Sequence, residues 1–205
     1  MKRCLGLALS IACCLLAVPS AESAEVAQGA LSDVKGSVEV LKRGTKDWVE
    51  VQHAHMIAPG DVVQTGINGK ATLNFKNSVT TIDPLTQFVL GRSVEQDTEI
   101  YTELYLLSGK VSSHVKKTKL SGIKNRFNVV TPTAVVGVRG TVQTVEYNPG
   151  MGTHADIKDG KGFAAPVPIE KLPPAVLELL GLKVDTKPGK DTAAGPLKSS
   201  EKKKE

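Results

Sequence analysis

The chain has 205 residues, of which 40% are hydrophobic and 23% are charged, so it has room for one ordinary domain with tails. One Trp, three Tyr and four Phe are too few for an aromatic platform that binds sugars or nucleic acids. The formal net charge of +5 comes mostly from the two ends, because residues 24–157 hold 14 basic against 13 acidic residues. The charge therefore does not predict a nucleic-acid-binding face.

Residues 1–23 have the features of a secretory signal peptide. A positive start, Met1-Lys2-Arg3, is followed by an apolar run from Leu5 to Val18 and by small residues around Ala21 and Ser23. The run is shorter than the roughly 20 residues that a membrane-spanning helix needs. We therefore expect a mature protein that is periplasmic or secreted and has no transmembrane segment after signal cleavage.

All three cysteines, Cys4, Cys13 and Cys14, lie inside this leader. A mature chain without them has no disulfides, no thiolate metal ligands and no cysteine nucleophile. The residues before Cys13 are loosely like a lipoprotein signal, so lipidation of Cys13 is the alternative to removal of the whole leader.

From residue 31 onward, short runs alternate between apolar and polar residues. Alternation with period two is typical of strands with one buried face. Turn-forming pairs separate the runs, among them Asn68-Gly69, which suits a tight hairpin turn. Strands are expected at residues 34–41, 71–75, 80–82, 87–90, 103–107, 109–112, 126–130 and 141–147.

A loose repeat suggests how these strands are arranged. A glycine followed by an alternating strand recurs at intervals of 33, 40 and 31 residues, at Gly36, Gly69, Gly109 and Gly140. The repeat predicts an all-β fold that is a β-solenoid-like stack of short strands. A small β-sandwich or barrel would give nearly the same pattern and is the alternative.

The composition changes near residue 160. We therefore assign residues 24–160 to one β domain, with its core at 31–147, and residues 161–205 to a Pro/Lys-rich linker and tail. One short helix is expected in the tail, from Pro174 to Leu180, because a proline begins it and Gly181 ends it. The rest of the tail is predicted to be disordered.

Two short segments carry the most informative turn residues. Gly60-Asp61 and Thr65-Gly66 flank residues 62–64, and we expect them to form the turns at the ends of that strand. Thr131-Pro132 favours an extended or turn conformation, and the valines of residues 135–138 suit a buried strand.

Arg139 follows these valines and is the most informative polar residue of the chain. A guanidinium in a buried strand needs a carboxylate or several carbonyl groups as partners. A structural tie to Asp61 or to strand-end carbonyls is the first interpretation of Arg139. Binding of an anion or of a carboxylate-bearing ligand is the second.

Residues 31–147 resemble the FecR-domain family. The most specific pieces are Pro59-Gly60-Asp61 with Thr65-Gly66, and the string TPTAVVGVRGT at residues 131–141. The resemblance implies an extracytoplasmic, β-solenoid-like domain, whose namesakes sense iron-siderophore uptake and pass the signal to an inner-membrane sigma-factor system. The family-motif residues, expected to be mostly structural, are Gly60, Asp61, Thr65, Gly66, Thr131, Pro132, Thr133, Val138, Arg139, Gly140 and Thr141.

The sequence departs from the regulatory members of this family. They carry a cytoplasmic anti-sigma segment and a membrane helix ahead of the domain, whereas a leader of only about 20 residues precedes it here, which is too short for both elements. The chain resembles a stand-alone secreted or periplasmic version, and any transmembrane signalling is expected to need a separate membrane partner.

Catalytic and cofactor motifs are lacking, so we expect no enzyme activity, no catalytic residues and no cofactor. His53 and His55 would lie on the same side of a strand, a spacing that a metal ion can use. A third ligand would have to come from a distant part of the chain, because only His114 and His154 add further imidazoles. No metal site is therefore assigned.

Five cations lie within residues 116–126, in a stretch whose composition is that of a solvated loop. The functional alternative for this loop is an envelope phosphate or a polyanionic cell-wall polymer, which would bind more weakly in salt. The leading hypothesis is thus a non-enzymatic cell-envelope binding or scaffolding module that meets an envelope protein or a cell-wall polymer. The alternative is a periplasmic sensor of a small ligand or ferric chelate that acts through a separate membrane partner.

Overall fold

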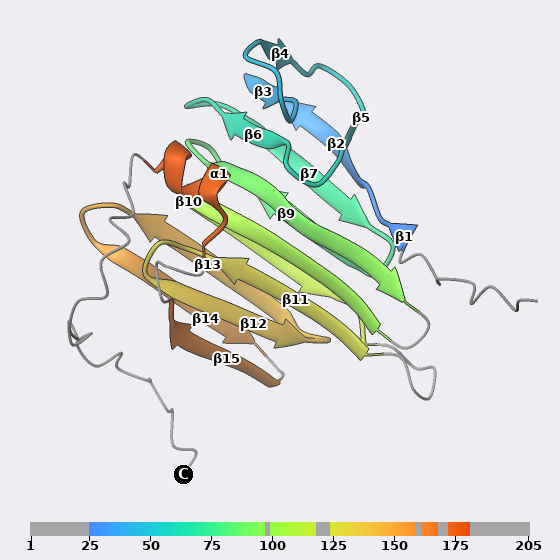
Figure 1. The fold of residues 1–205 in the computed structure, drawn as a ribbon, viewed down its shortest axis with the longest axis vertical. Helices are drawn as coiled ribbons and strands as arrows, with labels where there is room; N and C mark the ends of the chain where they lie inside the picture. Colours follow the sequence, from blue (N-terminus) through green and yellow to red (C-terminus); the bar gives the residue numbers. More distant parts are fainter. Residues whose placement is uncertain (1–24, 97–98, 118–123, 159–160, 168–171, 181–205) are drawn as a thin grey trace, which may run out of the picture.

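The computed structural model describes residues 25–96, 99–117, 124–158, 161–167 and 172–180 (Figure 1). Nearly all regular structure in these ranges is strand, so the all-β prediction is confirmed. The predicted signal peptide and the tail after residue 180 lie outside the described residues.

The strands are β1 (Glu25–Val26), β2 (Gly29–Lys35), β3 (Val38–Leu41), β4 (Trp48–Glu50), β5 (His55–Ile57), β6 (Val62–Thr65), β7 (Lys70–Phe75), β8 (Ser78–Ile82), β9 (Gln87–Gln96), β10 (Glu99–Val115), β11 (Lys124–Val130), β12 (Ala134–Arg139), β13 (Val142–Asn148), β14 (Gly152–Lys158) and β15 (Lys161–Pro166), and the helix is α1 (Pro174–Leu179).

The strands form two layers that share β10. Layer A has the strand order β4-β3-β6-β9-β10-β11-β12-β15, with β1 beside β9. Layer B has the order β5-β2-β7-β8-β10-β13-β14. All these pairs are antiparallel except β10 with β11, which is parallel. The result is a curled, mostly antiparallel sheet, in effect half of a barrel (Figure 1).

Strand β10 connects the layers because it is long and bends. Its first ten residues pair with β9 and β11 in layer A, and its last seven pair with β8 and β13 in layer B. The change of layer occurs at Gly109, which has a φ of +86°. Residues with side chains avoid this backbone region, so glycine is suited to the bend.

The antiparallel pairing separates this fold from a β-solenoid. Successive coils of a parallel β-helix stack in one direction, whereas neighbouring strands here run in opposite directions in every pair but one. The glycines of the loose repeat mark turns and the bend of β10, not the starts of coils. Of the two architectures considered from the sequence, the small sandwich or barrel is the closer one.

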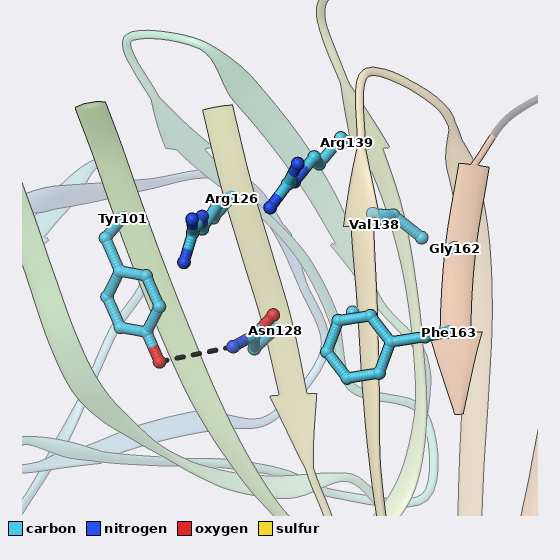
Figure 2. A pocket seen from close by; sticks show the side chains of 8 residues that line it. Tyr101, Arg126, Asn128, Val138, Arg139, Gly162 and Phe163 are labelled. Carbon is cyan, nitrogen blue, oxygen red and sulfur yellow. Dashed lines mark hydrogen bonds between the residues drawn. The ribbon is translucent and has the colours of Figure 1, made fainter. Parts of the chain in front are cut away.

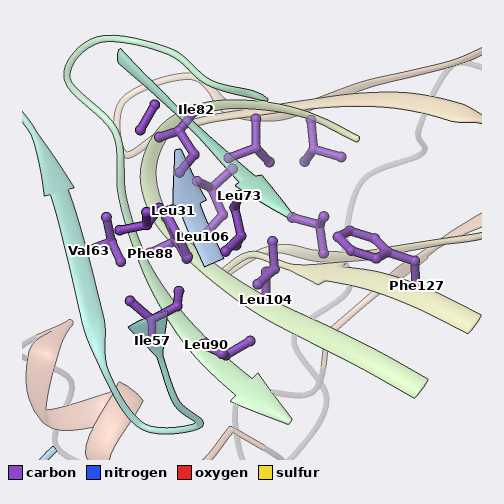
Figure 3. Packing of buried hydrophobic residues seen from close by; sticks show 14 of the residues in the cluster. Leu31, Ile57, Val63, Leu73, Ile82, Phe88, Leu90, Leu104, Leu106 and Phe127 are labelled. Atoms are coloured by element: carbon purple, nitrogen blue, oxygen red, sulfur yellow. The ribbon is translucent and has the colours of Figure 1, made fainter. Parts of the chain in front are cut away.

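The main core lies between the two layers (Figure 3). Alternate residues of each strand point inward, so the period-two pattern of the sequence becomes a shared apolar interior. Its largest fully buried apolar side chains are Phe88, Phe127, Leu31, Ile57, Leu73, Ile82, Leu90, Leu104 and Leu106.

A second apolar cluster lies on the outer face of layer A, under helix α1. Val176 and Leu177 of the helix, with the preceding Leu172, pack on outward-facing residues of β6, β9, β10 and β11. The helix therefore covers one end of that face. No helix among the described residues has the length and apolar character needed to cross a membrane.

The sheet extends beyond the boundary expected at residue 160. Strand β15 pairs with β12 over six residue pairs, from Ala134 with Pro166 to Arg139 with Lys161. Helix α1, which ends at Leu179, also packs on the sheet. Composition did not reveal either contact, because proline and glycine make residues 161–174 look like a linker. Residues 161–167 and 172–180 are thus part of the folded structure.

Candidate functional site

The register of layer A arranges the side chains of its outer face in rows that cross the strands, because directly opposite residues share a face. The row under α1 is apolar and consists of Val89, Tyr105, Val130 and Val135. The next row, beyond the helix, consists of Arg92, Glu103, Asn128, Gly137 and Phe163. The third row consists of Val94, Tyr101, Arg126, Arg139 and Lys161, with Arg139 directly opposite Lys161 and one position beyond the last pair of β11 with β12.

In this third row, two arginines face each other on neighbouring strands. The pairing of β11 with β12 ends at Phe127 and Val138, and Arg126 and Arg139 are the next residues of the two strands, both on the outer face. Figure 2 shows both side chains on the same side of the sheet. Like charges at opposite positions destabilise an antiparallel pair, so this arrangement costs stability. Within the described ranges, Arg126 forms an ion pair with Glu99, and no carboxylate lies within ion-pairing distance of Arg139.

A cavity of about 260 Å³ opens beside the two arginines. It is lined by Tyr101, Arg126, Asn128, Gly137, Val138, Arg139, Gly162 and Phe163 (Figure 2). A second hollow, of about 230 Å³, shares Tyr101 and Arg126 with it and is also lined by Arg92, Val94 and Glu99. We call the two hollows together the arginine groove.

A hydrogen-bonded chain fixes the wall of the groove. Asn128 donates from Nδ2 to the hydroxyl of Tyr101 over 3.2 Å, and that hydroxyl donates to Glu103 over 3.0 Å. The hydroxyl of Tyr105 donates to the other oxygen of Glu103 over 3.1 Å. Burial, and then the carboxylate of Glu103, raise the pKa of both tyrosines above the ordinary value. Both hydroxyls therefore keep their protons at neutral pH and act as donors to Glu103.

Gly137 and Phe163 form the other side of the groove. They are opposite each other on β12 and β15. A Cβ atom at position 137 would lie 2.3 Å from the ring of Phe163 and 2.6 Å from Oδ1 of Asn128, so the ring occupies the space that a side chain would need. The Phe163 side chain is nevertheless 54% exposed. An aromatic ring thus rests against the sheet and stays accessible from the groove.

The predicted tie between Arg139 and Asp61 is wrong. Asp61 lies in layer A at the start of β6, is 3% exposed, and forms its ion pair with Lys42 over 2.9 Å. It also accepts hydrogen bonds from the backbone N–H groups of Arg43 and Ala58, each over 2.9 Å. Arg139 is exposed, because it is the last residue of β12 and points outward rather than into the core. Within the described ranges, no hydrogen bond joins the Arg139 side chain to a strand-end carbonyl either.

The first family motif surrounds β6 and makes contacts within the fold. Gly60 donates its N–H to the carbonyl of Leu90. The hydroxyl of Thr65 donates to the carbonyl of Asp83 over 2.8 Å and accepts from the N–H of Thr86 over 2.9 Å. Gly66 donates its N–H to the carbonyl of Ser37. These residues connect β6 to the loops beside it, on the part of the sheet away from the groove.

The second motif forms the loop before β12, the strand itself and the turn after it. Thr131 is buried, and its hydroxyl bonds to the backbone of Ala134 and to the hydroxyl of Thr153, which Thr133 also contacts. Pro132 lies between Thr131 and Thr133 in the sequence. After the strand, Gly140 has a φ of +65°, and the Thr141 hydroxyl donates to the carbonyl of Lys158. Val138, which is buried, and exposed Arg139 belong to the strand and line the groove.

The two histidines considered for a metal ion are not on one strand. His55 lies in β5, whereas exposed His53 precedes that strand. Burial, and then the nearby Lys42, lower the pKa of His55, which favours its neutral form. Across the described ranges, no three His, Cys, Asp or Glu side chains come together as metal ligands do.

A family model, that of the FecR protein, matches residues 61–161. The chain is a FecR-domain protein. The match begins at Asp61 and ends at the first residue of β15, so the FecR domain contains every arginine of the groove. FecR proteins are regulators and sensors of the cell envelope and act with membrane partners. Neither the curated proteins nor the solved structures gave a match to the chain.

Of the residues that line the arginine groove, one arginine, Arg139, could be selected from the sequence, and most of the others were missed. Arg126 was expected at the start of the strand at residues 126–130 and among the charges of residues 116–126, but not as part of a site; residues 118–123 lie outside the described ranges. Tyr101, Asn128 and Phe163 were not selected at all. Alternation within β10 and β11 does place Tyr101, Arg126 and Asn128 on the outward positions, but only the strand pairing shows that they are neighbours.

Proposed function

We propose that this FecR-domain protein is a non-enzymatic binding module of the cell envelope, and that the arginine groove binds an anionic group of its partner. The observation that carries this proposal is that Arg126 and Arg139, on neighbouring strands just beyond the last pair of β11 with β12, line the same cavity. Two exposed guanidinium groups that repel each other gain most from an anion placed between them, because each can form charge-assisted hydrogen bonds with it. The leader-like residues 1–23 support a location outside the cytoplasm.

Replacement of Arg139 by glutamate is expected to abolish capture of the partner. The measurement is a cross-linking pull-down from intact envelopes, with residues 24–205 as bait, at low and at high salt. An anionic partner should be lost with Arg139→Glu and should weaken with salt for the wild type. Lys46→Glu, an equal charge change at an exposed loop residue remote in sequence from the groove strands, is the control and should leave capture unchanged.

Equal capture by the wild type and Arg139→Glu would exclude the groove as the binding surface. Protease treatment of the captured material separates the two kinds of partner, because an envelope protein is degraded and a cell-wall polymer is not. Arg126, Arg139 and Phe163 are exposed on the part of the outer face that lies beyond α1, so either partner has access to the groove.

The second candidate function is a sensor of a small ligand or ferric chelate that acts through a separate membrane partner. The size of the cavity favours it, since about 260 Å³ is close to the lower end of the range of small-molecule pockets. A ferric chelate with free carboxylates is expected to raise the melting temperature of the wild type in proportion to its concentration, but not that of Arg139→Glu. An unchanged melting temperature of the wild type would remove this candidate.

A further inference from the structure

We infer that the larger hollow of the arginine groove is a site for a small planar carboxylate, which stacks on Phe163 and is held by Arg126 and Arg139. This inference rests on the proposed function, because it names the chemical class of the anion that the groove selects. Three features of the hollow carry it: the paired cations, the exposed ring and the shape of the floor.

The paired cations favour a carboxylate at one end of the hollow. Each guanidinium presents N–H donors in one plane, which match the two oxygens of a carboxylate. Arg126 already has Glu99 as a partner, whereas Arg139 is free of carboxylates among the described residues. A single small anion between the two strands therefore supplies Arg139 with a partner and reduces the repulsion between the arginines.

Phe163 supplies a flat apolar surface beside these cations. Its ring is held against the backbone of Gly137, with no side chain between them, and more than half of the side chain remains exposed. An exposed ring backed by the sheet is ready to stack with another planar group, and offset stacking adds affinity beyond the burial of apolar area. In Figure 2 the ring lies on the far side of Asn128 from Tyr101, below the two guanidinium groups.

The floor and wall select against bulky ligands. Asn128 has its Nδ2 committed to Tyr101, and the hydroxyl of Tyr101 is committed to Glu103, so these side chains hold fixed positions. A rigid wall on one side and a ring on the other suit a ligand that is thin in one dimension. A cavity of about 260 Å³ has room for one or two rings.

The test is a titration of the ¹⁵N-labelled chain with four probes, followed through the amide signals of Gly137, Gly162 and Phe163. The probes are benzoate, cyclohexanecarboxylate (same charge, not planar), benzyl alcohol (planar, neutral) and inorganic phosphate. Benzoate should shift these signals with saturation and bind roughly three- to tenfold more tightly than cyclohexanecarboxylate, the range expected for one stacking contact. Benzyl alcohol and phosphate should bind more weakly than benzoate.

Three variants show which residues produce the selectivity for benzoate. Arg139→Gln should weaken benzoate binding about tenfold or more, through loss of a charge-assisted hydrogen bond. Phe163→Leu keeps an apolar side chain but removes the ring, so it should make the affinities for benzoate and cyclohexanecarboxylate equal. Gly137→Ala should act like Phe163→Leu, because its Cβ atom would push the ring from its place.

Equal binding of the two carboxylates by the wild type, or phosphate binding as tight as that of benzoate, would overturn the inference. So would retention of benzoate selectivity in Phe163→Leu. If benzoate fails to bind while Arg139→Glu still abolishes capture from envelopes, the planar-carboxylate inference is wrong and the proposed binding function stands. If Arg139→Glu has no effect on capture and benzoate does not bind, both are wrong.

Discussion

Replacement of Asp61 by alanine is expected to lower the free energy of unfolding by about 3 kcal/mol at pH 7, the range for leaving buried polar groups without partners. The carboxylate is 3% exposed and accepts from the ammonium of Lys42 and from the N–H groups of Arg43 and Ala58. Alanine would leave these two N–H groups without an acceptor. Urea unfolding measures the loss, and Asp47→Ala, which removes an exposed carboxylate, is the control and should change stability by less than about 0.5 kcal/mol.

The contribution of Asp61 also has a defined pH dependence. Burial alone would raise its pKa, but the N–H groups of Ala58 and Arg43 and the ammonium of Lys42 outweigh burial and lower the pKa below the ordinary 3.8. A carboxyl group whose pKa is lower in the folded state stabilises the fold above the unfolded pKa and loses this contribution as the pH falls through the folded pKa.

The stability difference between the wild type and Asp61→Asn should therefore be constant from neutral pH down to about pH 5 and shrink at lower pH. Urea midpoints at a series of pH values measure it. A difference that grows as the pH falls below 4 would show that the folded pKa is not lowered.

The role of Asp61 illustrates what the sequence could and could not predict. The pair Gly60-Asp61 is typical of a turn, and the turn is present at the start of β6. The partner of the carboxylate was not predictable, because Lys42 lies 19 positions away and reaches Asp61 only through the pairing of β3 with β6. Arg139 seemed the better partner from the sequence because it follows a run of apolar residues. The structure places it at the exposed end of that strand, where no burial requires a carboxylate.

For the fold, too, one part could be predicted from the sequence and another part could not. Alternation along the strands predicted which residues face the interior, and Leu73, Phe88 and Phe127 do so. Alternation is a property of one strand, so it contains no information on whether the neighbouring strand is parallel or antiparallel. The solenoid and the sandwich therefore could not be separated. Strand β15 was missed for a related reason, because Lys161–Pro166 is short and becomes a strand only by pairing with β12.

The arginine groove depends entirely on register, and this explains why its parts looked unremarkable in the sequence. Tyr101, Arg126 and Arg139 lie on three different strands, and each taken alone is an ordinary outward residue. A shift of one position between β11 and β12 would place Arg139 on the opposite face from Arg126. Register also sets the position of Arg92, because the bulge at Gly91 between β9 and β10 places Arg92 opposite Glu103. The candidate site is thus a product of the pairing of β9 to β15.

The second large effect is expected at Gly109, where β10 passes from layer A to layer B. Gly109→Ala should lower the free energy of unfolding by about 3 kcal/mol, as the sum of a left-handed backbone cost and overpacking. Its φ is +86°, and a Cβ atom there would lie 2.5 Å from Cα of Thr86 and 2.6 Å from the carbonyl oxygen of Leu85. Both contacts are with backbone, which cannot move away as a flexible side chain can.

Gly44→Ala is the matched control for this prediction. Gly44 has a similar φ of +79°, but a Cβ atom there would have no heavy atom within 4 Å. It should therefore lose only the backbone contribution, about 1 kcal/mol. Urea unfolding of the two variants separates backbone strain from the close approach of β10 to the loop at residues 84–86. Equal losses would mean that this loop moves away from β10 without cost, which would contradict the expected overpacking. A larger loss at Gly109 would show that the backbone of Leu85 and Thr86 does not yield to a Cβ atom at the bend of β10.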